Sequence, residues 1–193
     1  KFAISIGSEG DGVVVEMWYG GTSKITAFNN YTTDGGWHHI AVTYDNTGNG
    51  VLKVYIDCVD DSTNVADGNF GTPDIASTAP ILFGGVANTS GVPIAISIFG
   101  GRISDAIIVD KALSAVEVNE LYYNGRRKPT LTGLSFLANV ISWWPLGNHY
   151  RDAIDGTGVS SVNNRIWDVM NNNHGTSSSN MKATDIVVET VAK

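Results

Sequence analysis

Short runs of β-branched and aromatic residues alternate with clusters of Gly, Asn and Asp through residues 1–110. Runs of about four to eight such residues bounded by turn formers are typical of β-strands. Their spacing suits antiparallel hairpins and leaves no room for crossover helices, which argues against a parallel α/β sheet. We predict strands at residues 1–6, 13–18, 37–44, 51–59, 80–86, 94–99 and 102–109.

The clearest turn signal is residues 45–50, Asp-Asn-Thr-Gly-Asn-Gly, between two of these runs. Asn and Gly tolerate the positive φ angles that hairpin loops require. One helix also has signals at both ends. Ser114 and Glu117 have the spacing of a capping box, and Gly125 suits the left-handed position that ends a helix. We therefore predict a helix over about residues 115–124, and its apolar face at i, i+3 and i+4 consists of Val118, Leu121 and Tyr122.

Composition supports an all-β chain, because Gly reaches 22 residues and only 16% of residues are charged. A length of 193 residues suits one sandwich, or one domain plus part of another. We place Trp37, Trp143 and Trp167 in the core and expect Trp37→Ala to cost about 3–5 kcal/mol through cavity formation. Cys58 is the single cysteine, so it has no internal disulfide partner and is predicted to be a small buried apolar side chain.

The net charge of −7 makes nucleic acid an unsuitable partner, and the basic run at residues 126–128 is short. No stretch approaches the roughly eighteen consecutive apolar residues that a membrane helix needs, so we expect no membrane insertion. Residues 1–6 have a strand pattern from the start, which indicates a chain cut from something longer. The lack of a signal peptide therefore says nothing about export.

Two segments carry a resemblance to a known family. Residues 36–45, Gly-Trp-His-His-Ile-Ala-Val-Thr-Tyr-Asp, with residues 52–57 resemble the central hairpin of laminin-G-like and pentraxin-like domains. Residues 100–114, followed by Glu117 and Leu121, are similar to the closing strand and end helix of that family. The resemblance implies an antiparallel β-sandwich of the jelly-roll, concanavalin A-like type with one short capping helix, occupying residues 1–125.

The remaining segment, residues 126–193, departs from the family order. Residues 141–147 and 167–176 resemble the opening strands of such a domain, although here they follow the closing helix. They either complete the same sandwich in a permuted arrangement or begin a tandem repeat. We favour the first interpretation, because incomplete domains would leave unpaired edges and exposed Trp side chains. The predicted helix, the linker with Pro129, the Trp143-Trp144 pair and the ending at residues 180–187 are together also similar to proteins of marine bacteriophage particles.

Catalysis is not predicted. Glycoside hydrolases of the concanavalin A-like fold need two carboxylates across the scissile bond, and the Glu-x-Asp-x-x-Glu pattern of that group is absent. His38 and His39 are adjacent, so on a strand they face opposite sides and cannot hold one metal together. Of the pair, we expect one ring to be buried and hydrogen-bonded and the other to be half exposed.

The resemblance implies instead a binding module that takes a glycan or another cell-surface ligand outside the cell or on a virion surface. An alternative is a structural protein of a virus-like particle that contacts other particle proteins. Calcium is an expected ligand at the rim through Asp34 and Asp45, although both are also explained as turn residues. Sugar contacts are expected from exposed aromatic and amide side chains. These are Tyr19, Asn29, Tyr31 and Asn88.

Overall fold

The computed structural model describes residues 2–6, 13–19, 22–28, 36–48, 50–61, 81–87, 93–122, 130–146, 152, 164–170 and 172–177. The chain divides into two compact units, each made from two separate stretches. The first unit contains residues 1–81 and 111–135, and the second contains residues 82–110 and 136–193. All strand pairings among the described residues are antiparallel.

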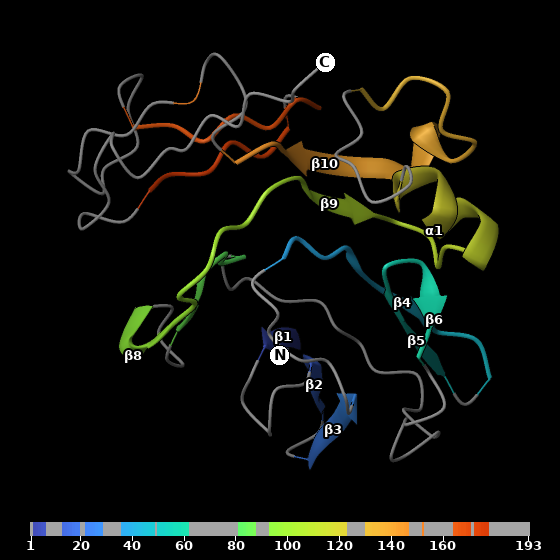
Figure 1. The fold of residues 1–193 in the computed structure, drawn as a ribbon, viewed down its shortest axis with the longest axis horizontal. Coiled ribbons are helices and arrows are strands. Elements are labelled where there is room, and N and C mark those ends of the chain that lie inside the picture. The colour runs from blue at the N-terminus through green and yellow to red at the C-terminus, as the bar shows by residue number, and fades with distance from the viewer. Residues whose placement is uncertain are drawn as a thin grey trace. The chain divides into compact units, whose positions relative to one another are not determined.

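The elements are shown in Figure 1. In chain order they are β1 (Phe2–Ile6), β2 (Val13–Tyr19), β3 (Thr22–Phe28), β4 (Ile40–Asp45), β5 (Val51–Ile56), β6 (Val59–Asp60), β7 (Gly85–Ala87), β8 (Pro93–Ile98), β9 (Ala106–Val109), α1 (Ala115–Tyr122), the 3₁₀ helix η3 (Leu137–Asn139) and β10 (Val140–Trp144).

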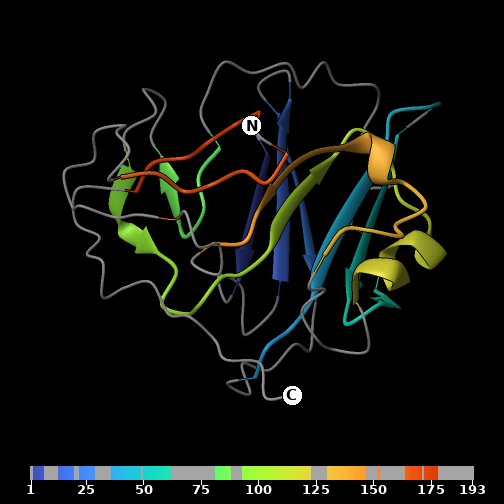
Figure 2. The same cartoon turned by 90° about the horizontal axis from the view of Figure 1, so that it is seen from above.

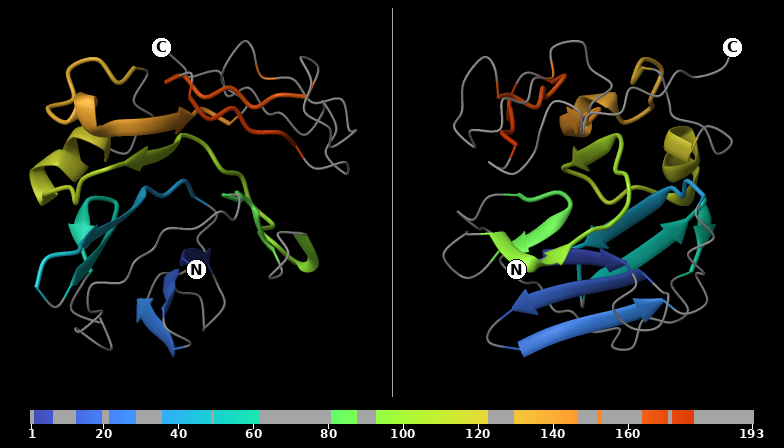
Figure 3. Two further views of the ribbon diagram at one scale, coloured as in Figure 1. Left: turned by 180° about the vertical axis from the view of Figure 1, so that it is seen from behind. Right: turned by 60° about the vertical axis from the view of Figure 1, so that its left-hand side comes forward.

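The first sheet of the first unit has the strand order β1-β2-β3, drawn in blue in Figure 3. Strand β3 was not predicted, because its sequence Thr-Ser-Lys-Ile-Thr-Ala-Phe has few apolar residues. Its register on β2 pairs Tyr19 with Thr22, which leaves two residues between the paired strands. Those two residues are Gly20 and Gly21, a pair typical of two-residue hairpin loops. The Gly-Gly pair was therefore the signal for β3.

The second sheet of this unit has the order β4-β5-β6. The predicted turn is confirmed: Asp45 pairs with Val51 at the hairpin end, and Gly48 and Gly50 have φ angles of 61° and 75°. Strand β5 supplies much of the core of this unit. Its buried residues are Leu52, Val54, Tyr55 and Ile56.

Cys58 differs from its prediction. It lies with Asp57 in the two-residue turn between β5 and β6, where both residues have positive φ angles, 67° and 49°. Cys58 is half-buried, and its thiol donates to Oδ1 of Asn119 over 3.4 Å. The expected strand position for Cys58 was wrong because the strand run ends at Ile56 and a two-residue turn of the type I′ kind requires both positive φ angles.

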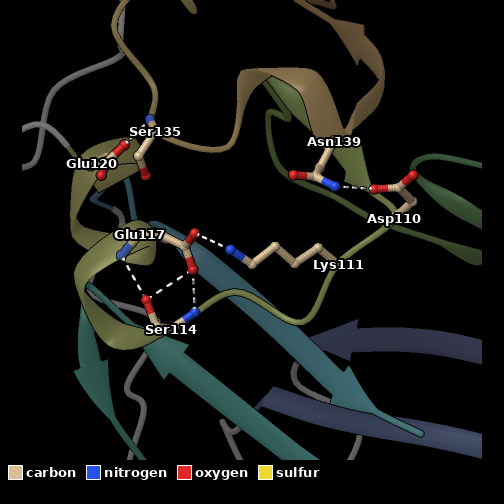
Figure 4. Close-up of polar contacts among 7 residues, drawn as sticks. All are labelled: Asp110, Lys111, Ser114, Glu117, Glu120, Ser135 and Asn139. Atoms are coloured by element: carbon tan, nitrogen blue, oxygen red, sulfur yellow. Dashed lines mark hydrogen bonds and ion pairs between the residues drawn. The ribbon is translucent and has the colours of Figure 1, made fainter.

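The helix α1 has the predicted capping box (Figure 4). The backbone N–H and the hydroxyl of Ser114 both donate to Oε2 of Glu117 at 2.9 Å, and the N–H of Glu117 donates to the Ser114 hydroxyl at 3.3 Å. Lys111 forms an ion pair with the same carboxylate. These bonds satisfy the backbone N–H groups of Ser114 and Glu117, two of the donors that a helix start leaves without an intrahelical partner.

One face of α1 packs as predicted, and Val118 is fully buried. The ring of Tyr122 lies 5.9 Å from the ring of His39, measured between centroids. Figures 1 and 2 show α1 beside the β4-β5-β6 sheet. On the other side of the helix, Glu120 accepts the N–H of Ser135 at 2.7 Å, so this carboxylate holds the chain that follows the helix.

In the second unit, β9 and β10 lie side by side and pair antiparallel (Figure 1). The register shifts between Val140 and Ser142, so Ile141 is the extra residue of a β-bulge and is 40% exposed. Asn139 donates its side-chain N–H to Asp110 at 2.9 Å at the start of this pair. β7 and β8 pair separately. The buried apolar residues described in this unit include Phe136, Val140, Trp143 and Trp144.

The three Trp side chains assigned to the core differ in burial. Trp143 is 6% exposed, which confirms its assignment, and Trp167 is only half-buried. Trp37 is 49% exposed, so its prediction as a core residue is wrong. The reason is that β4 begins at Ile40, and Trp37 therefore precedes the alternation of inward and outward side chains that the strand imposes.

Candidate binding surfaces

The segment before β4 carries an exposed aromatic residue, Trp37, directly before two histidines that fix a carboxylate in place. The N–H of His39 donates to Oδ1 of Asp57 at 2.9 Å, and Nδ1 of His38 lies 2.8 Å from Oδ2 of the same carboxylate. The N–H of Asp57 in turn donates to the carbonyl of His39 at 2.9 Å. Both oxygens of Asp57 are thus fixed by the residues that directly follow Trp37. We call Trp37, His38 and Asp57 the Trp37 cluster.

The two histidines of this segment have different environments. The side chains of His38 and Asp57 are 22% and 31% exposed, so their pair is accessible to a ligand. Burial lowers the pKa of His39, although the Asp57 carboxylate acts in the opposite direction. Nδ1 of His39 is buried and has no hydrogen-bond partner among the residues that the structure describes. The prediction that the buried ring makes the hydrogen bond is therefore wrong. The more accessible His38 bonds to Asp57, and the more buried His39 packs against Tyr122.

The second unit contains a hairpin over residues 164–177. Ile166 and Gly175 exchange two backbone hydrogen bonds of 2.8 and 2.9 Å. The next pair along the hairpin is Trp167 and His174, whose ring centroids are 4.1 Å apart. Arg165 places its guanidinium carbon 5.8 Å from the centroid of the Trp167 ring, within cation–π range.

The turn of this hairpin is built around the fully buried carboxylate of Asp168. Oδ1 accepts the N–H groups of Trp143 and Met170 at 2.9 and 3.0 Å. Oδ2 accepts those of Asn172 and Asn173 at 3.2 and 2.8 Å. Burial by itself raises the pKa of Asp168, but the hydrogen bonds outweigh it, so the pKa is lowered. The carboxylate therefore stays ionised inside the turn.

Most of the residues predicted to bind a ligand fall outside the described part of the chain. Asn29, Tyr31, Asp34 and Asn88 lie there entirely. The backbone of Tyr19 belongs to β2, and its side chain lies outside the described atoms. Their roles in ligand binding stay predictions.

Asp45 is the one predicted site residue whose side chain is described. It is exposed, and its Oδ1 accepts the N–H of Thr47 at 2.9 Å, which is the bond expected of a turn Asp. Within the described residues, no group of three or more His, Cys, Asp or Glu side chains is arranged to hold a metal ion. Calcium at Asp34 and Asp45 also stays a prediction.

Sequence reasoning missed Asp57, although a signal for it was present. The turn at residues 45–50 fixes the β4-β5 register, in which Ile40 pairs with Ile56. Extending that register by one residue places Asp57 opposite His39. Arg165 and Asp168 were also missed as site residues, because their surroundings come from a hairpin whose turn has no Asn-Gly or Asp-Gly signal.

The sequence matches the laminin G family model described as the concanavalin A-like lectin/glucanases superfamily over residues 1–119. The chain therefore belongs to this superfamily, and the predicted fold class, an antiparallel all-β sandwich with one helix, is confirmed. No curated protein and no solved structure matches the chain. Membership defines a lectin-like type of binding module; domains of the laminin G type are generally noncatalytic, and the superfamily also includes glucanases.

One further property of the described residues concerns membranes. Their α-helix, α1, has 8 residues, and no helix in the described part of the chain has the length and apolar character needed to cross a bilayer.

Proposed function

We propose that this domain is a noncatalytic module that binds a carbohydrate on an extracellular or particle surface. The observation that carries the proposal is the 49% exposure of Trp37 directly before a fixed polar pair. Sugar sites combine an aromatic face with a few well-placed polar groups. The indole offers its face to the C–H groups of a pyranose ring, and the chain is of the lectin-like type.

The polar part of the site is the carboxylate of Asp57 with the imidazole of His38. The bonds from His38 and from the His39 N–H fix the orientation of the carboxylate. The side chain of Asp57 remains 31% exposed, so sugar hydroxyl groups reach it from solvent. An orientation fixed before binding lowers the entropy cost of forming hydrogen bonds to the ligand.

Two further parts of the proposal rest on the family resemblance. We keep a noncatalytic role because the sequence lacks the Glu-x-Asp-x-x-Glu pattern of the hydrolases that share this fold. We keep calcium as a ligand through Asp34 and Asp45, to be tested by chelation. If calcium bound there, EDTA would lower the melting temperature of the intact chain or weaken glycan binding.

A glycan array tests the proposal on the intact chain, with calcium and with EDTA. We expect a small group of chemically related glycans to bind, and Trp37→Ala to lose this binding while Trp37→Phe keeps part of it. Val59→Ala is the matched control, because Val59 is an exposed apolar residue, at 68%, in the same unit. Binding that survives Trp37→Ala, or that Val59→Ala removes equally, would place the sugar elsewhere.

A second candidate function, a structural protein of a virus-like particle, is favoured by exposed apolar side chains of the second unit. Leu82, Phe83 and Ile103 are 37%, 43% and 37% exposed. Phe83 is anchored by Trp144, with ring centroids 5.3 Å apart. Exposed apolar groups of this kind mark protein contacts. Light scattering after size-exclusion chromatography supports this function if Phe83→Ser converts an oligomer to a monomer, and opposes it if the intact chain is a monomer.

A further inference from the structure

The hairpin over residues 164–177 has two faces of different character. Asn164 and Ser177 are buried and hydrogen-bonded to each other. Because side chains alternate along a strand, Arg165 and Trp167 lie on the opposite face from Asn164. Ile166 and Gly175 form the hydrogen-bonded pair, so the adjacent Trp167 and His174 form the closer, non-hydrogen-bonded pair. Arg165, Trp167 and His174 thus form a row on one face, which we call the Arg165 row.

A hydrogen bond from the backbone determines which ring nitrogen of His174 can donate. Nδ1 accepts the N–H of Asp168 at 3.1 Å, so the neutral ring carries its proton on Nε2. Within the described part of the chain, Nε2 makes no hydrogen bond. The same contact keeps the ring against Trp167. The row therefore presents an N–H donor in a fixed orientation.

The guanidinium of Arg165 is the second donor of the row. No carboxylate among the described residues pairs with it, although the chain has 19 Asp and Glu residues and a net charge of −7. A guanidinium held near an indole ring keeps donors in a planar fork that matches a carboxylate. A guanidinium that has no carboxylate partner among the described residues of an acidic chain is the feature that a small anionic ligand would use.

We propose that the Arg165 row is a second saccharide site, which takes a sugar bearing a carboxylate. Arg165 binds the carboxylate, the indole of Trp167 contacts the ring carbons, and Nε2 of His174 donates to a hydroxyl group. The net charge of −7 disfavours long polyanions, so a single carboxylate at one fixed guanidinium is the better match. The site shares no residue with the Trp37 cluster and rests on the proposed function only in assuming that the domain binds sugars.

The test uses the intact chain, with glucuronic acid and glucose as probes in saturation-transfer NMR and calorimetric titration. We expect glucuronic acid to bind more tightly than glucose. Arg165→Gln should weaken the binding of glucuronic acid about tenfold or more. Arg102→Gln is the matched control, because Arg102 is exposed in the same unit and its loss changes the net charge equally. It should bind as the wild type does.

Acetate separates a sugar site from a bare anion site, because only the carboxylate is common to both probes. Competition by acetate at the same concentration as glucuronic acid would overturn the proposal, as would normal binding by Arg165→Gln or equal loss in Arg102→Gln. Trp37→Ala separates the two sites. If Trp37→Ala removes all sugar binding and Arg165→Gln removes none, the proposed function stands and the second site is contradicted. If Arg165→Gln removes the binding and Trp37→Ala removes none, the second site is supported and the Trp37 cluster is contradicted as a sugar site.

Discussion

Oδ1 of Asp168 accepts the backbone N–H of Trp143 over 2.9 Å, which ties the turn of the 164–177 hairpin to strand β10. The carboxylate is fully buried and also orders the backbone of Met170 and Asn173. The N–H of Val169 completes the attachment by donating to the carbonyl of Trp143 at 2.8 Å. One ionised side chain therefore organises the turn and joins it to the strand.

Asp168→Asn should destabilise the folded chain by about 2 kcal/mol. The amide keeps the shape of the side chain but replaces one acceptor oxygen by a donor, which then faces backbone N–H groups. Asp110→Asn is the control, because the exposed Asp110 carboxylate accepts, among the described residues, a single hydrogen bond from Asn139, which an amide oxygen can keep. Chemical denaturation followed by circular dichroism measures both variants. Equal stability of the two would mean that the buried carboxylate does not organise the turn.

Acid should weaken the fold through carboxylates whose pKa is lowered in the folded state. The pKa of Asp168 is lowered by its hydrogen bonds despite burial, and that of Glu117 is lowered to about 2, first by its hydrogen bond to Lys111. Their stabilisation is complete above the unfolded pKa of about 4 and is lost as pH falls through the folded values. Melting temperatures from pH 7 to pH 2 should drop below about pH 4, and less steeply in Asp168→Asn.

The exposure of Trp37 lowers the stability cost of removing its side chain below the value expected from the sequence. Trp37→Ala should cost about 1 kcal/mol or less, because half of the side chain is already in water. Trp143→Ala should cost about 3–5 kcal/mol, because Trp143 is buried and its indole N–H donates to Asp105 at 2.9 Å. Calorimetric melting of both variants checks the contrast. A larger loss of stability for Trp37→Ala than for Trp143→Ala would contradict the exposed position of Trp37 and support its burial in the core.

The capping box of α1 should contribute measurably to stability. Ser114→Ala removes the hydroxyl that caps the Glu117 N–H and should cost about 1 kcal/mol. Ser114→Thr keeps the hydroxyl and serves as the control, and Ser114→Asp should recover most of the loss. The measurement is the midpoint of urea unfolding. Identical midpoints for Ser114→Ala and Ser114→Thr would show that the cap does not contribute.

We propose that residues 126–193 complete the sandwich rather than begin a repeat. The support is the pairing of β10 with β9, which joins this segment to the strand before α1. A chain ending at Gly125 lacks β10 and should lose its cooperative melting transition, while the intact chain keeps it. A truncated chain that melts like the intact one would instead favour a tandem repeat.

The sequence predicted those elements whose signals are local. The turn at residues 45–50 and the capping box of Ser114 and Glu117 each need only a few neighbouring residues, and both are confirmed. Strand β3 has a weak apolar pattern, and only the Gly-Gly pair before it signalled a hairpin. The helix signals gave its start at Ala115 correctly.

The candidate sites were less predictable because they depend on where a strand begins. Trp37 is exposed because β4 begins at Ile40, and a shift of a few residues in that boundary reverses the burial of a side chain. Arg165 and His174 both lie against the ring of Trp167. The turn of their hairpin is held by the buried carboxylate of Asp168. A carboxylate that organises a turn by accepting backbone N–H groups has no sequence pattern beyond a single Asp.

The most direct test of the proposed function is calorimetric titration of the glycan found on the array into the intact chain and into Trp37→Ala. We predict saturable binding at one site in the wild type and at least tenfold weaker binding in Trp37→Ala, with the same melting temperature in both to within a few degrees. Equal affinity of the two proteins for that glycan would contradict the assignment of the Trp37 cluster as the sugar-binding site.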